Sequence, residues 1–214
     1  MTDLSFELLN IAPEPYAVVP NLLARVRITE SSGVPIHALA LRAQVRIEPQ
    51  RRRYSDAEAA AMADLFGTRD RWASTLKSFL WMQTSTTVQG FTSTCETDIA
   101  LPCTYDFDVT ASKYLHALQD NKTIPIAALF SGTVFTNGNS GRFGVEQIPW
   151  DRECSYEMPV QVWKDLVRLH YPNTGWVRLD HDTLAALARF KSDRGLIGFD
   201  EAVTDLLAGA EVTP

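Results

Sequence analysis

The chain has 214 residues, of which 45% are hydrophobic and 21% are charged, a balance that is typical of globular proteins and excludes extensive intrinsic disorder. Its net charge of -6 argues against generic nucleic-acid binding, because neutralising phosphates requires a basic face. The apolar stretches are interrupted by Pro125 and Gly132 and fall short of the ~20 residues of a membrane-spanning helix, and the N-terminal MTDLSFELLN does not resemble a signal peptide.

Alternating patterns predict strands in the first part of the chain, at residues 4–9 and 22–29. The longest alternating run extends from Ile36 to Glu48, where polar Arg42, Gln44, Arg46 and Glu48 oppose a face formed by His37, Leu39, Leu41, Ala43, Val45 and Ile47. This run predicts a strand with one buried face.

A helix is predicted next, because Ser55 and Glu58 have the spacing of a capping box and Gly67 is suited to end the helix. Strand patterns return at residues 79–88, 91–101 and 105–109. Thr110 is then placed to cap a helix over residues 111–119.

The near-continuous apolar run IPIAALFSGTVF, residues 124–135, predicts a strand buried on both faces. Asn137-Gly138 predicts a hairpin to a strand at 143–148. After Met158 the patterns are helical: from Pro159 to about His170, over residues 182–191, and from an Asp200 cap to Leu207.

Strands first and helices last predict an α+β fold, mainly an antiparallel β-sandwich or curved sheet with interspersed helices and a C-terminal helical cap. We expect residues 1–158 to form a β-rich core with two helices and residues 159–214 to form a helical segment packed on it in one integrated domain. The alternative is two small domains divided near residue 158.

No local motif identifies a catalytic residue, a metal site or a cofactor, and we expect none of the three. The four histidines lack HExxH spacing, and a metal site would need distant segments to converge, with His170, His181 and Asp182 as the alternative ligands. Ser131 lacks a GxSxG context. Cys95, Cys103 and Cys154 lack the close pairing of metal sites, and their odd number favours reduced thiols in a cytoplasmic protein.

Partner binding has its best candidates in basic and aromatic residues. Arg51, Arg52, Arg53 and Tyr54 form the compact basic run, which precedes a capped helix and is suited to meet an acidic partner. Trp150 and Trp176 lie in segments bounded by proline or glycine, where an indole ring can line an interface instead of the core.

Several blocks together resemble an uncharacterised actinobacterial protein family whose members are encoded near genes for uptake nickel-iron hydrogenases. The blocks are RIEPQRRRYSDAE at 46–58, DLFG at 64–67, LPCTYDFDVTASKYLHAL at 101–118, IPIAALFSGTVF at 124–135 and IPWDRECSYEMPVQVW at 148–163. The resemblance implies a genomic neighbourhood and no reaction.

We therefore expect a non-catalytic accessory or assembly protein that binds another protein, with a hydrogenase component as the partner that the resemblance implies. The alternatives are a hydrolase or metal-dependent enzyme with a dispersed site, and a small-ligand carrier with its pocket between sheet and helices.

Overall fold

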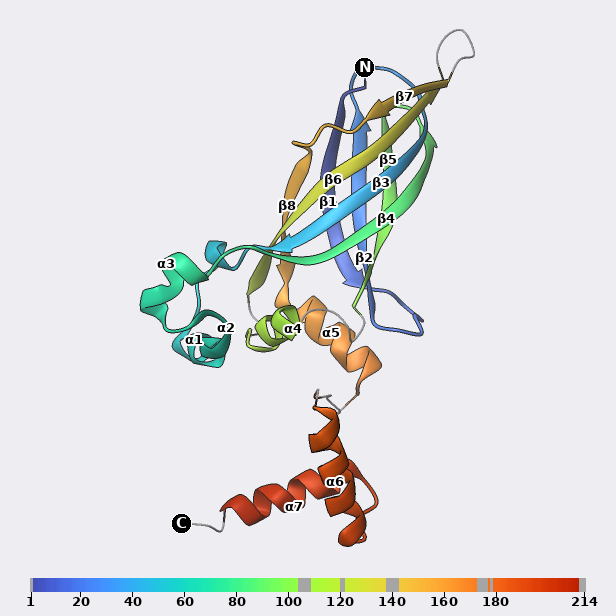
Figure 1. Cartoon of the computed structure of the whole chain (residues 1–214). Helices are drawn as coiled ribbons and strands as arrows, with labels where there is room; N and C mark the ends of the chain where they lie inside the picture. The colour runs from blue at the N-terminus through green and yellow to red at the C-terminus, as the bar shows by residue number, and fades with distance from the viewer. Residues whose placement is uncertain are drawn as a thin grey trace. The chain divides into compact units, whose positions relative to one another are not determined.

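The computed structural model describes residues 2–103, 109–119, 122–137, 143–172, 177 and 179–211, and its fold is α+β with antiparallel sheets, as the sequence predicts (Figure 1). The chain divides into two compact units, Met1–Pro172 and Asn173–Pro214. All of the described strands belong to the first unit.

A three-stranded sheet has the order β1-β2-β5, with every pair antiparallel. Its strands are β1 (Leu4–Pro13), β2 (Asn21–Glu30) and β5 (Thr94–Pro102). The strand predicted at residues 22–29 is confirmed as β2, and Ala24, Val26 and Ile28 form its buried face.

A five-stranded sheet has the order β4-β3-β6-β7, with β8 also paired to β6. Its strands are β4 (Phe79–Phe91), β3 (Ile36–Ile47), β6 (Thr123–Asn137), β7 (Phe143–Gln147) and β8 (Glu153–Pro159). One edge of β6 pairs with β3, while its other edge is shared between β8, at residues 123–129, and β7, at residues 133–137.

The two sheets pack face to face and enclose the hydrophobic core between them (Figure 1). The ring of Phe6 on β1 stacks on the ring of Phe130 on β6 with centroids 4.3 Å apart, which fixes the contact between the sheets. The burial alternates along β3, where Leu39, Leu41 and Val45 point inward.

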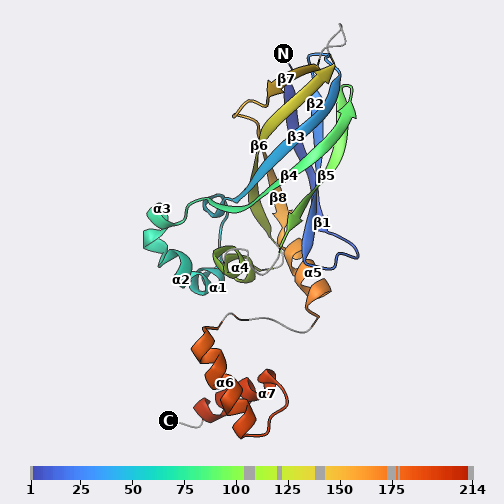
Figure 2. The ribbon, with the colours of Figure 1, turned by 45° about the vertical axis from the view of Figure 1, so that its right-hand side comes forward.

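The helices of the first unit gather at one end of the sandwich in both views (Figures 1 and 2). Between β3 and β4 lie η1 (Pro49–Arg51), α1 (Asp56–Ala61), α2 (Ala63–Phe66), η2 (Arg69–Arg71) and α3 (Trp72–Thr75); α4 (Val109–His116) precedes β6, and α5 (Val160–His170) follows β8. Trp163 and Leu166 of α5 are buried, and the helix contacts β1 and β8. Among the described helices of the first unit, none covers the outer face of the five-stranded sheet in either view.

The predicted capping box is confirmed, since the Ser55 side chain accepts a hydrogen bond from the Glu58 backbone and Glu58 accepts one from the Ser55 backbone. The predicted single helix is interrupted at Met62, where α1 ends and α2 begins. Gly67 ends α2 with a positive φ of 72°. Two predicted caps are wrong, because Thr110 and Asp200 lie inside helices that begin one residue earlier, at Val109 and Phe199.

Other local predictions need correction. The run at 124–135 is continuously buried only over Ile124–Ile126, because buried and more exposed residues alternate from Ala127 to the exposed Ser131. His37 is exposed, since a register shift between Ile36 and Ala38 changes the phase of β3. Residues 92–93 turn the chain between β4 and β5, and β8 was not predicted at all. The strand predicted at 105–109 and the turn at Gly138 lie largely outside the described residues.

The second unit contains α6 (His181–Asp193) and α7 (Phe199–Glu211), which agrees with the predicted helical C-terminal part. Arg194 forms an ion pair with Asp205, and the ammonium of Lys191 lies 5.2 Å from the centre of the Phe199 ring. Gly195 turns the chain between the helices with a φ of 66°. In this unit Ala202 is the one buried residue among those described.

Candidate functional site

On the outer face of the three-stranded sheet, the arginines of β2 form ion pairs with carboxylates on the neighbouring strands. Arg25 lies directly opposite Asp98 in the β2–β5 register and pairs with it at 2.9 Å. Arg27 lies opposite both Glu7 and Glu96 and pairs with each, at 3.0 Å and 2.9 Å. Each of these guanidinium groups therefore has a carboxylate directly across the strand.

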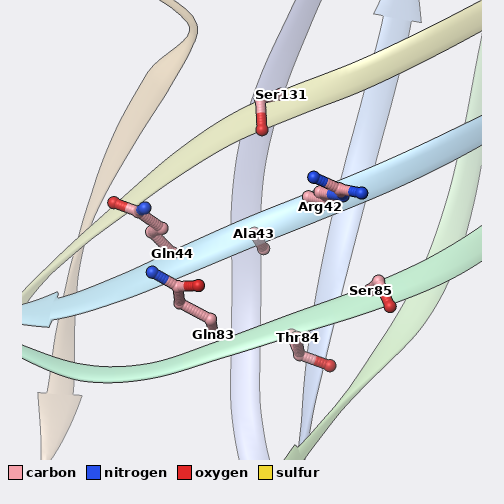
Figure 3. A pocket seen from close by; sticks show the side chains of 7 residues that line it. All are labelled: Arg42, Ala43, Gln44, Gln83, Thr84, Ser85 and Ser131. Atoms are coloured by element: carbon pink, nitrogen blue, oxygen red, sulfur yellow. The ribbon is translucent and has the colours of Figure 1, made fainter.

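Arg42 on the five-stranded sheet has no such partner. The residues directly opposite it are Ser85 on β4 and Ser131 on β6 (Figure 3). Among the residues that the structure describes, no ion pair or hydrogen bond reaches its side chain, and the residue is exposed. Arg42 is thus an exposed strand arginine that forms no ion pair with the described residues.

Two open hollows meet at Arg42 on the outer face. One, of about 320 Å³, extends toward Gln44, Gln83 and Ser131, and the other, of about 400 Å³, extends toward Thr87. The exposed lining side chains are the Arg42 guanidinium, amides, hydroxyls and one methyl group, whereas Leu41 and Ala43 are buried toward the core. The lining residues are Ala40, Leu41, Arg42, Ala43, Gln44, Gln83, Thr84, Ser85, Thr86, Thr87 and Ser131. We call these residues the Arg42 face.

The Arg42 face can bind an anion by charge-assisted hydrogen bonds. A guanidinium offers a planar fork of donors that matches a carboxylate, while the surrounding hydroxyls and amides donate and accept neutral hydrogen bonds. Since the lining residues include no carboxylate, imidazole or thiol, the face offers recognition chemistry and no acid–base pair.

The predicted basic run is divided between the interior and the surface. Arg52 has a side chain only 4% exposed, and its guanidinium donates to Glu58 at 2.8 Å and to the Thr123 carbonyl at 2.8 Å. Arg51 is paired with Glu48 at 2.7 Å, whereas Arg53 is exposed. Arg52 therefore belongs to the interior, whereas Arg51 and Arg53 lie at the surface.

Glu58 is the anchor of this buried cluster. Its carboxylate accepts hydrogen bonds from Arg52, from Lys122 at 3.2 Å and from the backbone amides of Ser55 and Gln119. Burial alone raises the pKa of Glu58, but these donors together outweigh it and lower the pKa to about 2. One carboxylate thus joins the basic run, α1, the segment after α4 and the residue that precedes β6.

Tyr54 also belongs to the interior. Its hydroxyl lies 2.8 Å from the Tyr114 hydroxyl and donates to the Pro49 carbonyl, and its ring lies under the Arg52 guanidinium. Burial raises the pKa of Tyr54 to about 12. Direct contact with a partner is consequently open to Arg51 and Arg53, while Arg52 and Tyr54 hold the loop in place.

The two tryptophans predicted to bind a partner have different outcomes. Trp150 lies in the connection between β7 and β8, and its side chain is 90% exposed. Trp176 lies outside the described residues. An indole ring exposed to this degree is available for apolar contact.

The alternative metal ligands are divided between the two units. His170 ends α5 in the first unit, while His181 and Asp182 begin α6 in the second unit. Within the described ranges, no three side chains of histidine, cysteine, aspartate or glutamate form a group that could hold a metal ion.

The three thiols are free, and burial raises the pKa of each: that of Cys103 to about 12, that of Cys154 to about 11 and that of Cys95 by a smaller amount. A raised pKa lowers the fraction of thiolate, which is the reactive form, at neutral pH.

Sequence reasoning missed the Arg42 face. It assigned Arg42 and Gln44 to the polar side of a strand and considered Ser131 only as a nucleophile. The available signal was the composition of residues 79–91, FLWMQTSTTVQGF, which offer no carboxylate to a neighbouring strand.

No described helix has both the length and the apolar character that crossing a bilayer requires. No curated protein matches the sequence.

Several solved structures match weakly. Beta-glucosidase 3B from Thermotoga neapolitana has 12% identity and a TM-score of 0.26 over 73% of this chain and 17% of its own. A beta-glucosidase from Kluyveromyces marxianus has 10% identity and a TM-score of 0.26 over 73% of this chain and 15% of its own. The ApaA protein from Bordetella pertussis has 15% identity and a TM-score of 0.25 over 74% of this chain and 95% of its own.

This chain therefore spans less than a fifth of either glucosidase, and at these TM-scores the likenesses support no argument about fold or function. A protein family, in contrast, matches residues 1–214, the whole sequence. The chain belongs to DUF6084, a family of unknown function.

Proposed function

We propose that this protein is a non-catalytic accessory or assembly protein that binds another protein through the outer face of its five-stranded sheet. The observation that carries the proposal is Arg42, which is exposed among hydroxyl and amide side chains, has no ion pair with the described residues and lies on a face that no described helix of the first unit covers. A partner carboxylate there would gain a charge-assisted pair that the chain itself does not supply.

The same face has an apolar end that favours a protein over a small anion. Phe143 and Val145 on β7 are 63% and 62% exposed, and the Phe143 ring meets the ring of His37 at 4.9 Å. Val145 lies opposite Phe135, four residues along β6 from Ser131, or about 14 Å from the level of Arg42. Arginine and aromatic anchors on one surface are the usual composition of interface hot spots.

The resemblance to proteins encoded beside uptake hydrogenase genes makes a nickel-iron hydrogenase component the first partner to test, in the cytoplasm. Arg51, Arg53 and Trp150 are further contact candidates, since their side chains are accessible. A test of the basic run should change only Arg51 and Arg53, because removing Arg52 would leave Glu58 short of a partner.

The experiment compares the full chain with Arg42→Gln and, as the matched control, Arg25→Gln, which alters a paired arginine on the other sheet. Each is used as bait after in-cell crosslinking, and a partner recovered with wild type is then purified for a Kd measurement. We expect Arg42→Gln to weaken binding about tenfold and Arg25→Gln to leave it unchanged.

Equal affinity of all three proteins would refute the proposed surface. Purified hydrogenase subunits are titrated in parallel; if they fail to bind while another partner depends on Arg42, only the hydrogenase assignment falls.

A further inference from the structure

We propose that β4 is the docking edge of this protein, where an extended acidic segment of the partner adds to the five-stranded sheet as a further strand. The inference rests on the proposed function, because it names the element of the partner that meets the Arg42 face. Its occupant is an extended polypeptide segment with an aspartate or glutamate that reaches Arg42.

Among the described residues, the outer edge of β4 forms no second ladder, although β4 also contacts β5, the strand that follows it after residues 92–93. β4 pairs with β3 alone and is the end of the strand order, as Figure 1 shows. Among the described residues, no backbone hydrogen bond reaches β4 apart from its ladder with β3. The unpaired N–H and C=O groups along that edge form a template for another strand.

β4 also lacks the features that normally protect an edge. Its 13 residues include no charged residue and no proline. The other outer strands differ: β1 contains Glu7 and Pro13, β5 contains Glu96 and Asp98, β8 contains two glutamates and a proline, and β7 has only five residues. Natural proteins use charges, prolines and short strands to keep edges from pairing, so the long neutral β4 is suited to receive a strand.

The side chains of β4 leave Arg42 within reach of an added strand. Neighbouring strands are about 4.8 Å apart, so a strand added beyond β4 would lie about 10 Å from β3. Ser85, directly between them, has a short side chain. A guanidinium and a glutamate side chain can therefore meet above Ser85 and form the pair that Arg25 and Asp98 form on the other sheet.

Charge complementarity favours an acidic partner over a second copy of this chain. Pairing two β4 strands would bring together two edges without a carboxylate and would leave both Arg42 side chains unpaired. An acidic segment satisfies the backbone edge and the guanidinium together.

The experiment uses the full chain and a short synthetic peptide of alternating threonine and valine with one central glutamate, together with its glutamine twin. Hydrogen exchange with mass spectrometry locates binding, and fluorescence anisotropy gives Kd. We expect the glutamate peptide to protect amides of residues 79–91 and to bind about tenfold tighter than its twin.

Variants make the charge argument specific. Arg42→Gln should remove the preference for glutamate. The variant Ser85→Glu should bind the glutamate peptide about tenfold more weakly than wild type does. The new glutamate lies directly across the strand from Arg42 and supplies it with a carboxylate from the same sheet. The melting temperature of the Ser85→Glu variant should equal or exceed that of wild type, which shows that the variant loses binding without losing its fold. Arg25→Gln is the control that should keep the preference.

Protection of another strand, equal Kd values for the two peptides, or no binding of either would overturn the inference. Concentration-dependent protection of β4 without peptide would assign the edge to a second copy and overturn it as well. If a natural partner binds in an Arg42-dependent way but leaves β4 amides unprotected, the docking edge is refuted while the proposed function stands.

Discussion

Glu58→Gln should destabilise the first unit strongly at neutral pH, and the destabilisation should fade in acid. The Glu58 side chain is fully buried and forms ion pairs with Arg52, at 2.8 Å, and with Lys122, at 3.2 Å. Removing its charge leaves the buried Arg52 guanidinium without a counter-charge, and breaking such a pair costs about 3–5 kcal/mol.

The pH dependence follows from the lowered pKa of Glu58. Its pKa drops from 4.5 to about 2 on folding, and one pKa unit corresponds to about 1.4 kcal/mol, which gives about 3 kcal/mol. A lowered pKa stabilises the fold above the unfolded-state pKa, and this contribution is lost as the pH falls from about 4.5 to about 2. Glutamine at this position does not titrate.

The assay is urea unfolding followed by tryptophan fluorescence at a series of pH values from 7 downward. The difference in unfolding free energy between wild type and Glu58→Gln should shrink by about 3 kcal/mol between pH 5 and pH 2, while other carboxylates cancel in the comparison. Ser55→Ala, which removes the cap and keeps the carboxylate, should cost about 1 kcal/mol with little pH dependence. A difference between wild type and Glu58→Gln that stays constant with pH would refute the reasoning.

Three further predictions concern packing and reactivity. Gly132→Ala should lower the free energy of unfolding by about 4 kcal/mol or more, because a Cβ would lie 2.0 Å from the Ala40 carbonyl oxygen at a φ of 137°. The neighbouring change Ser131→Ala should alter the free energy of unfolding by no more than about 0.5 kcal/mol, and melting curves of the two variants test the difference. Iodoacetamide at pH 7.5 should label the three cysteines much more slowly in the native protein than in urea, and fast native labelling seen by mass spectrometry would contradict their raised pKa values. A fragment of residues 1–158 should aggregate because it lacks the buried Trp163 and Leu166, whereas a fragment of residues 1–172 should stay soluble and melt cooperatively in calorimetry. Equal solubility and equal melting of the two fragments would contradict the packing of α5 on the first unit.

The elements that sequence reasoning identified are those with a local cause. The alternation from Leu39 to Ile47 and the reciprocal bonds of Ser55 and Glu58 are encoded within a few residues. β8 was missed although Glu153, Ser155 and Glu157 alternate with less exposed residues. Met158 is the buried residue of this strand, and one apolar residue does not produce a recognisable alternating pattern in the sequence. A strand that exposes most of one face to solvent resembles a loop in composition.

The candidate site depends on contacts between distant segments. Whether Arg42 is paired is decided by which strands lie beside β3, and its neighbours Ser85 and Ser131 are remote in sequence. The burial of Arg52 likewise requires the carbonyl of Thr123. Periodicity assigns a residue to a face of its strand, but it does not identify the residue across the ladder.

The pairing of β3 with β6 has a consequence for synthesis of the chain on the ribosome. Arg42 and Ser131, which lie opposite each other in the β3–β6 ladder, are about 90 residues apart in the sequence. Since a ribosome adds about 5–20 residues per second, β6 is completed about 5–20 seconds after β3. During that time β4 can occupy only one edge of β3, and Leu39, Leu41 and Val45 have no complete core to enter. We therefore expect the incomplete sandwich to expose apolar residues and to aggregate during synthesis, so that lowering the growth temperature should raise the yield of folded protein more than changing the promoter.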